Sequence, residues 1–267
     1  MSIDESLGSM DLKKIASFLR TRQESAEYLE KVAKDKNIYI RVSYSGFRAI
    51  SIHPKQPCGA VPGFNGYVQE FEKVKDHLER LPKVDQLSIG NPGNNKPEHR
   101  LQAYLIYHSL VRERSMPEIL GCKHRFDELT FVTDELKLEN IRSDMLFLAR
   151  KDDVFFPVLV ELKNSRLLGR LQEQLQNTNR AMIESKLHFE TVFQAVIGKD
   201  KNGIDIPIDF SKINRVIIWP RRESGGELSS SSAEFRRDLL NCVLEFCPDA
   251  LDRLLDRDSY ASVFDLF

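Results

Sequence analysis

Residues 142–163 read RSDMLFLARKDDVFFPVLVELK and predict the hairpin around which the rest of the fold is arranged. Two largely apolar runs flank Asp152-Asp153, which we interpret as a two-residue turn between antiparallel strands. Counting outward from this turn places Asp144 directly opposite Glu161. The register depends on the turn, because a three-residue turn would shift the pairing by one, and Asp-Asp is a weaker turn signal than Asp-Gly.

Two carboxylates thus face each other across the predicted hairpin, and this needs a physical reason. Directly opposed residues have Cβ atoms roughly 4.5–5.5 Å apart, and like charges there are destabilising. A divalent metal bound by oxygens of Asp144 and Glu161 would neutralise both charges. Lys163 shares a face with Glu161 and lies opposite Arg142, so it would stand beside a metal-bound water or a reacting phosphate.

The alternative interpretation is an edge hairpin whose Asp144, Glu161 and Lys163 side chains point to water. The apolar residues of 158–162 argue against it, because such a run is typical of a central strand buried on both faces. Charges on a buried strand are costly unless they are paired or bound to a metal. We therefore expect a buried site that binds a metal.

The flanking sequence predicts an α/β domain with a central mixed β-sheet between helices. Turn residues at 90–97 mark a boundary between an N-terminal α+β extension, residues 1–90, and a domain formed by residues 91–267. In the first half we expect helices at 11–34, 68–81 and 98–112, a β-hairpin at 38–52 and a loop at 53–66. In the second half we expect strands at 128–132, 144–149, 158–163, 193–197 and 215–219, and helices at 167–187 and 235–246.

Composition limits the classes of function. The chain has 267 residues and 41% hydrophobic residues, which suffice for a core and exclude a disordered chain. Its net charge of −1 excludes a protein held to nucleic acid by bulk charge, so a nucleic-acid surface would be local. No apolar run approaches the ~20 residues that span a bilayer, and we see no signal peptide. The four cysteines form no CxxC pair, which predicts reduced thiols and a cytoplasmic protein.

A zinc site is the alternative for the cysteines. His53, Cys58, Cys122 and His124 could supply four ligands, but their spacings match no compact zinc finger. We prefer small buried cysteines and surface histidines.

The order of Asp144, then Glu161-x-Lys163 after a hairpin-length gap, resembles the core of the PD-(D/E)xK nuclease superfamily, whose fold is restriction-endonuclease-like. Arg142-x-Asp144 resembles the family's usual start of the Asp strand, with Ser143 in place of the Pro of the motif's name. The resemblance covers roughly residues 97–220. It implies a nuclease that uses Mg²⁺ or Mn²⁺.

The resemblance also implies roles for residues. Asp144, Glu161 and the Leu162 carbonyl would ligate the metal, and Glu98, on the preceding helix, would bind it through water or complete a second site. Lys163 would position or activate the attacking water.

Many family members carry a supporting Gln on the next helix. Gln174 fits this position best, Gln172 is the runner-up, and Thr178 stands where a Tyr is often found. Glu139 and Asp134 are alternatives for an extra carboxylate, although we expect both to be solvated.

Nucleic acid is the implied partner, with DNA favoured over RNA; a homodimer is left open. Arg142, Arg166 and Arg170 lie close in sequence to the catalytic strands and are expected to contact phosphates. The runner-up function is a non-catalytic module that binds nucleic acid or protein on a nuclease-like fold. The presence of all three motif residues disfavours it, because a degenerate copy usually loses at least one of them.

Overall fold

The computed structural model describes residues 115–138, 141–164, 168–221 and 235–246 continuously, together with strands at 38–42 and 50–54. It also describes eleven single helical positions, namely Arg20, Glu24, Glu27, Tyr28, Lys31, Asp35, Glu98, Leu101, Gln102, Leu105 and Ser109. Within these residues, no helix is long and apolar enough to cross a membrane.

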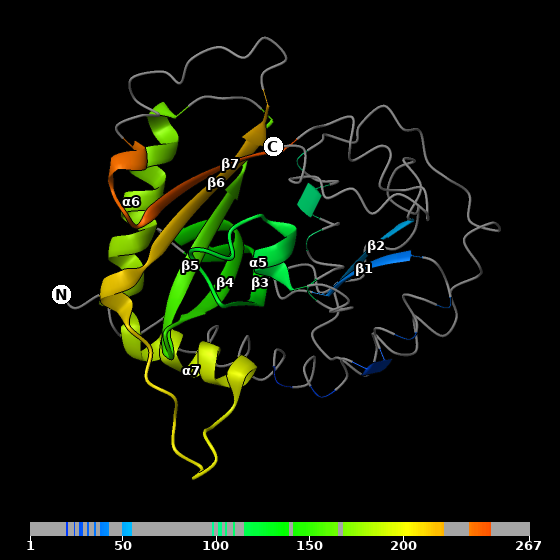
Figure 1. Ribbon diagram of the computed structural model, residues 1–267, viewed down its shortest axis with the longest axis vertical. Helices are drawn as coiled ribbons and strands as arrows, with labels where there is room; N and C mark the ends of the chain where they lie inside the picture. Colours follow the sequence, from blue (N-terminus) through cyan, green and yellow to red (C-terminus); the bar gives the residue numbers. More distant parts are fainter. Residues whose placement is uncertain are drawn as a thin grey trace.

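A five-stranded mixed sheet forms the centre of the described structure. Its order in space is β3-β4-β5-β6-β7, with β3–β4–β5 antiparallel and β5–β6–β7 parallel (Figure 1). The strands are β3 (Glu128–Leu138), β4 (Ile141–Lys151), β5 (Val154–Leu162), β6 (Asn214–Pro220) and β7 (Asn241–Phe246). The described helices are α5 (Met116–Ile119), α6 (Gly169–Glu184), α7 (Lys186–Ile197) and a 3-10 helix, η3 (Phe210–Lys212). The predicted α/β class with a mixed sheet is confirmed.

The β4–β5 hairpin has the predicted register. Seven residue pairs run from Lys151↔Val154 at the turn to Met145↔Val160. Asp152 and Asp153 form the turn, with φ angles of 48° and 61°. Positive φ at both central positions is what a two-residue type I′ turn requires. The last pair lies one step before Asp144 and Glu161, so these two residues come next where the ladder ends.

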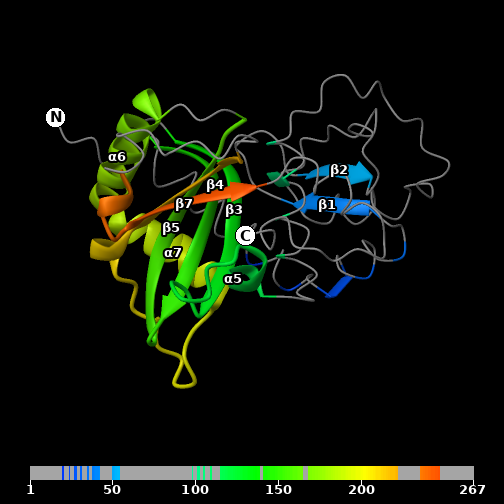
Figure 2. The ribbon, with the colours of Figure 1, turned by 45° about the horizontal axis from the view of Figure 1, so that its top comes forward.

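β5 is the central strand, because β4 and β6 flank it on either side. Its residues from Phe156 to Leu162 are all buried, which explains the unbroken apolar run at 158–160. The crossover from β5 to the parallel β6 contains α6 and α7. In both ribbon views α6 and the small β1–β2 sheet lie on opposite sides of the five-stranded sheet (Figures 1 and 2).

Two predicted elements are wrong. The strand expected at 193–197 is the last part of α7, where Phe189, Val192 and Phe193 are buried together at helical spacing. The helix expected at 235–246 is mostly strand: only 235–237 are helical, and 241–246 form β7. Residues 238–240 form a turn between these helical residues and β7, in which the Asp238 side chain accepts a hydrogen bond from the Leu240 amide at 2.9 Å. Pairing with β6 then outweighs the local helical spacing.

The N-terminal part contains the predicted hairpin, now seen as β1 (Ile38–Val42) paired antiparallel with β2 (Ile50–Pro54). The described positions between residues 20 and 35 are helical, in agreement with the predicted first helix. Tyr28 packs against the main hydrophobic core, which links this helix to the five-stranded sheet. The helix predicted at 68–81 and the boundary at 90–97 lie outside the described residues.

Candidate active site

Glu161 and Lys163 form the centre of the candidate site at the C-terminal end of β5. The Glu161 side chain is completely buried, and its Oε2 accepts a hydrogen bond from Lys163 Nζ at 2.8 Å. The same ammonium lies 3.5 Å from Oδ2 of Asp144, whose side chain is 30% exposed. Strand β5 therefore places a carboxylate and a lysine on one face, and β4 brings the second carboxylate to them, as the hairpin register predicts.

The electrostatics of the site favour a shared proton or a cation. The pKa of Glu161 is raised to about 7, first by burial and then by the neighbouring Asp144 charge, while Lys163 acts in the opposite direction. Burial lowers the pKa of Lys163, but the charges of Asp144 and Glu161 outweigh burial, so the net shift is upward. Two carboxylates and one ammonium thus carry one excess negative charge in a partly buried position, when all three are ionised.

Asp144 is held through both its side chain and its backbone. Its Oδ2 accepts a hydrogen bond from the Leu162 amide at 2.7 Å, and its carbonyl oxygen accepts one from Gln102 Nε2 at 2.9 Å. The Lys163 amide donates to Ile218 of β6 at 2.9 Å. Because the Leu162 carbonyl belongs to the same trans peptide group, it points the other way, toward β4 and Asp144. The site therefore gathers two carboxylates and a backbone carbonyl.

Helix α6 contacts both strands of the site. Gln174 Nε2 donates to Glu161 Oε1 at 3.1 Å. One turn later, the Thr178 hydroxyl donates to the Arg142 carbonyl at 3.1 Å and accepts from the Arg142 amide at 3.2 Å. The β4–β5 ladder does not extend to an Arg142–Lys163 pair; it ends at Met145↔Val160, and Thr178 binds the Arg142 backbone.

Gln102 is a site residue that sequence reasoning missed, and Thr178 was identified only as the residue that stands where a Tyr is often found. A signal for each was present, because each is a polar residue on a helix stripe that is otherwise apolar. Thr178 follows Leu171 and Leu175 on the buried stripe of α6, and Gln102 lies between Leu101 and Leu105. Both are buried, with exposed fractions of 0% and 2%.

Glu98 is helical and half-buried, one turn before Gln102, so its helix lies next to Asp144. Within the described residues, no group of three or more His, Cys, Asp and Glu side chains is close enough to share an ion. Direct protein ligands would thus be the Asp144 and Glu161 carboxylates and the Leu162 carbonyl. This all-oxygen set fits a hard cation, since Mg²⁺ is commonly held by one or two carboxylates and keeps several waters.

The remaining predicted residues are distributed as follows. Arg142 and Arg170 are exposed, near the start of β4 and of α6, whereas Arg166 lies outside the described residues. Asp134, expected to be solvated, is fully buried in β3 opposite Met145. Met145 points to the opposite face of the sheet from Asp144, so Asp134 does not join the two carboxylates. Glu139 lies outside the described residues.

Cys122 and Cys242 are buried free thiols, as expected for small core residues. Burial raises the pKa of Cys122 to about 12 and also raises that of Cys242. Both thiols are therefore protonated at neutral pH when no metal is bound. His53 and Cys58, the other half of the zinc alternative, have no described side chain.

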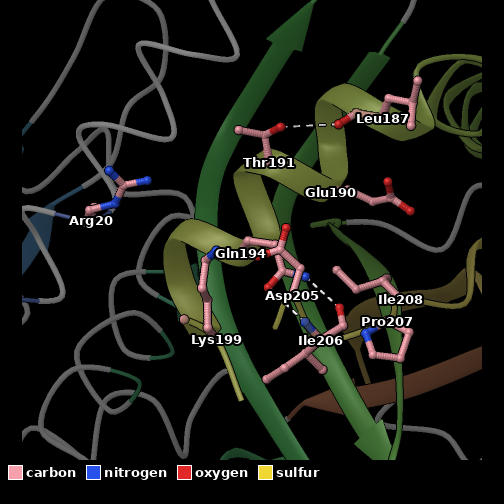
Figure 3. A pocket seen from close by; sticks show the side chains of 11 residues that line it. Arg20, Leu187, Glu190, Thr191, Gln194, Lys199, Asp205, Ile206, Pro207 and Ile208 are labelled. Carbon is pink, nitrogen blue, oxygen red and sulfur yellow. Dashed lines mark hydrogen bonds and ion pairs between the residues drawn. The ribbon is translucent and has the colours of Figure 1, made fainter. Parts of the chain in front are cut away.

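A pocket of about 680 Å³ lies apart from these residues, between α7 and the loop before η3 (Figure 3). Several of its polar side chains are engaged with one another or with the backbone around them. Gln194 binds both the amide and the carbonyl of Ile206, at 3.3 and 2.5 Å. Lys199 lies 3.4 Å from Asp205, and the Thr191 hydroxyl donates to its own helix. Asp144, Glu161 and Lys163 remain the candidate site, because these charged groups converge there.

Comparison of the chain with protein-family models, with curated proteins and with solved structures gives no match.

Proposed function

We propose that this protein is a metal-dependent nuclease that hydrolyses phosphodiester bonds, most favourably in DNA, on a restriction-endonuclease-like core. The observation that carries the proposal is the convergence of Lys163 on Glu161 and Asp144, at 2.8 and 3.5 Å, at the end of the central strand. A stable hairpin does not require charged groups that converge at the buried end of its central strand, and burying Glu161 costs free energy. Metal binding and catalysis would explain why Asp144, Glu161 and Lys163 lie together at this position.

A bound Mg²⁺ or Mn²⁺ would lower the pKa of a water and stabilise negative charge on the phosphate. Asp144, Glu161 and the Leu162 carbonyl would hold it, and Glu98 would assist through water. Lys163 would orient the attacking water and donate a hydrogen bond to a phosphate oxygen as negative charge develops there.

The remaining side chains support and extend this site. Gln174 orients the Glu161 carboxylate through the hydrogen bond at 3.1 Å. Arg142 and Arg170, both exposed beside the site, would bind flanking phosphates. The cytoplasm is the compartment we expect for such an enzyme with reduced thiols.

Cleavage assays test this proposal. The purified protein is incubated with plasmid DNA and with labelled single- and double-stranded DNA and RNA, in Mg²⁺, Mn²⁺ or EDTA. We expect cleavage that requires the metal and is lost in Asp144→Asn and Glu161→Gln. Glu190→Gln, purified in parallel, is the matched control, because Glu190 is a half-exposed carboxylate on α7 that lines the separate pocket.

The second candidate is a non-catalytic module on the same fold. If the wild type binds DNA or RNA but leaves every substrate intact in both metals, that candidate replaces the nuclease. If Asp144→Asn and Glu161→Gln cleave as fast as the wild type, the activity belongs to a contaminant or to another site.

A further inference from the structure

We propose that Thr178 and Gln102 are positioning residues that fix the backbone of β4 on both sides of the Asp144 side chain. Their effect on metal binding and cleavage rests on the proposed function, whereas the positioning of Asp144 does not. The proposal follows from the way the β4–β5 hairpin ends. Its last ladder pair is Met145↔Val160, so the ladder with β5 ends before it reaches Asp144 and Arg142, while β3 stays paired with the other edge of β4 as far as Leu138↔Ile141.

Thr178 holds β4 at Arg142, two residues before Asp144. Its hydroxyl both donates to and accepts from the backbone of this one residue, at 3.1 and 3.2 Å. A helical threonine usually bonds the carbonyl four residues back in its own helix, as Thr191 does with Leu187 at 3.3 Å in α7. Thr178 is fully buried, and its hydroxyl forms hydrogen bonds with the backbone of β4 instead of with its own helix.

Gln102 holds β4 from a different helix. Its Nε2 donates to the Asp144 carbonyl at 2.9 Å, and the side chain is only 2% exposed. The backbone of β4 is thus fixed at residue 142 from α6 and at residue 144 from the helix that carries Glu98. Because these two hydrogen-bonded positions are only two residues apart, they restrict the direction in which the Asp144 side chain leaves the backbone.

α6 also holds the other carboxylate, through Gln174 and Glu161 at 3.1 Å. Gln174 and Thr178 lie one turn apart on the same face of this helix. One rigid helix therefore contacts both strands and sets the separation of Asp144 and Glu161. Groups that orient metal ligands in this way typically contribute 10–100-fold to metal affinity or activity.

The first test needs neither metal nor substrate. The Leu162 amide donates to Asp144 Oδ2 at 2.7 Å, so its hydrogen exchange reports whether Asp144 is in place. We expect exchange at Leu162 to become faster by about tenfold or more in Thr178→Val, while Val160 in the same strand changes only as far as global stability does. Thr178→Ser, which keeps the hydroxyl, should restore protection. Thr191→Val is the matched control and should leave Leu162 unchanged.

Gln102→Met provides an independent variant, should Thr178→Val fail to fold, and it should accelerate Leu162 exchange in the same selective way. Unchanged protection of Leu162 in a folded Thr178→Val or Gln102→Met protein would overturn the proposal. Equal loss of protection at Leu162 and Val160 would also overturn it, because that result marks a general structural role.

The second test measures Mn²⁺ affinity and the kinetics of cleavage. We expect Thr178→Val to weaken Mn²⁺ binding by about tenfold and to lower kcat more than it raises KM, with rescue by Thr178→Ser. Wild-type affinity and kcat in Thr178→Val would overturn the positioning role. A wild type that neither binds Mn²⁺ nor cleaves would overturn the proposed function instead, and the exchange test would still decide the positioning of Asp144.

Discussion

The Lys163 ammonium lies 2.8 Å from Glu161 Oε2, two residues earlier on the same strand, and this carboxylate is completely buried. The pair places a full positive charge at the point where the two carboxylates converge. A divalent ion bound by the carboxylates would have to share this region with the ammonium or displace it. Lys163 is thus the counter-ion of the two carboxylates, and under the proposed function it would also orient the attacking water.

Substitution of Lys163 separates metal binding from catalysis. We expect Lys163→Met to retain Mn²⁺ affinity within about tenfold, because its ligands remain, and to lose at least about 10²-fold in kcat, because no ammonium orients the water. Isothermal titration with Mn²⁺ and a cleavage assay at the same pH measure the two effects. A variant that loses Mn²⁺ binding completely would show that Lys163 holds the site together rather than serving the reaction.

The stability of the metal-free protein should fall as pH rises through the range below 7. The pKa of Glu161 is about 7 in the folded protein and 4.5 as the ordinary value, so the unfolded chain releases this proton first. The free energy of unfolding therefore falls as pH rises, by about 2 kcal/mol between pH 5.5 and 7.5. Lys163 adds nothing in this window, since its pKa is raised above its ordinary 10.5.

Urea denaturation in EDTA at the two pH values measures this effect, and Glu161→Gln is the control. The variant cannot ionise at this position, so its stability should change little between pH 5.5 and 7.5. Carboxylates with lowered pKa values, such as Asp209, do not interfere, because their effect lies at lower pH. A wild type that gains stability over this range would contradict the prediction.

The hairpin turn offers a prediction on stability alone. Asp153 has φ of 61°, a left-handed conformation that glycine adopts without strain. We expect Asp153→Gly to raise the free energy of unfolding by about 1 kcal/mol, measured by thermal denaturation. The ion pair with Arg150 at 3.3 Å contributes little, because the Asp153 side chain is 95% exposed. Asp153→Ala should do the opposite, and a stabilised alanine variant would argue against this account of the turn.

The arginines beside the site should bind phosphates. We expect Arg142→Ala and Arg170→Ala each to weaken DNA binding and to lower the slope of log affinity against log salt by about 1, measured in EDTA to prevent cleavage. Lys212→Ala is the matched control, because Lys212 precedes β6 and lies at the opposite end of the parallel strands from Glu161. Equal slopes in all variants would place the nucleic-acid surface elsewhere.

The sequence determined the hairpin, its register and the residues that face each other at its open end. This was possible because strand alternation and a two-residue turn are local, and the Asp152-Asp153 turn has the geometry that the prediction requires. Local patterns failed at residues 193–197 and 235–246. There, burial of Phe189 and Phe193 in a helix and pairing of β7 with β6 decided the outcome.

Only the tertiary structure decided how the site is held. The hydrogen bonds from Gln102 to Asp144 and from Thr178 to Arg142 join residues 42 and 36 positions apart. No periodicity in the sequence specifies such contacts, since they depend on how two helices cross one strand. The sequence therefore named the charged groups, and the packing of helices against β4 and β5 determined their distances, burial and pKa values.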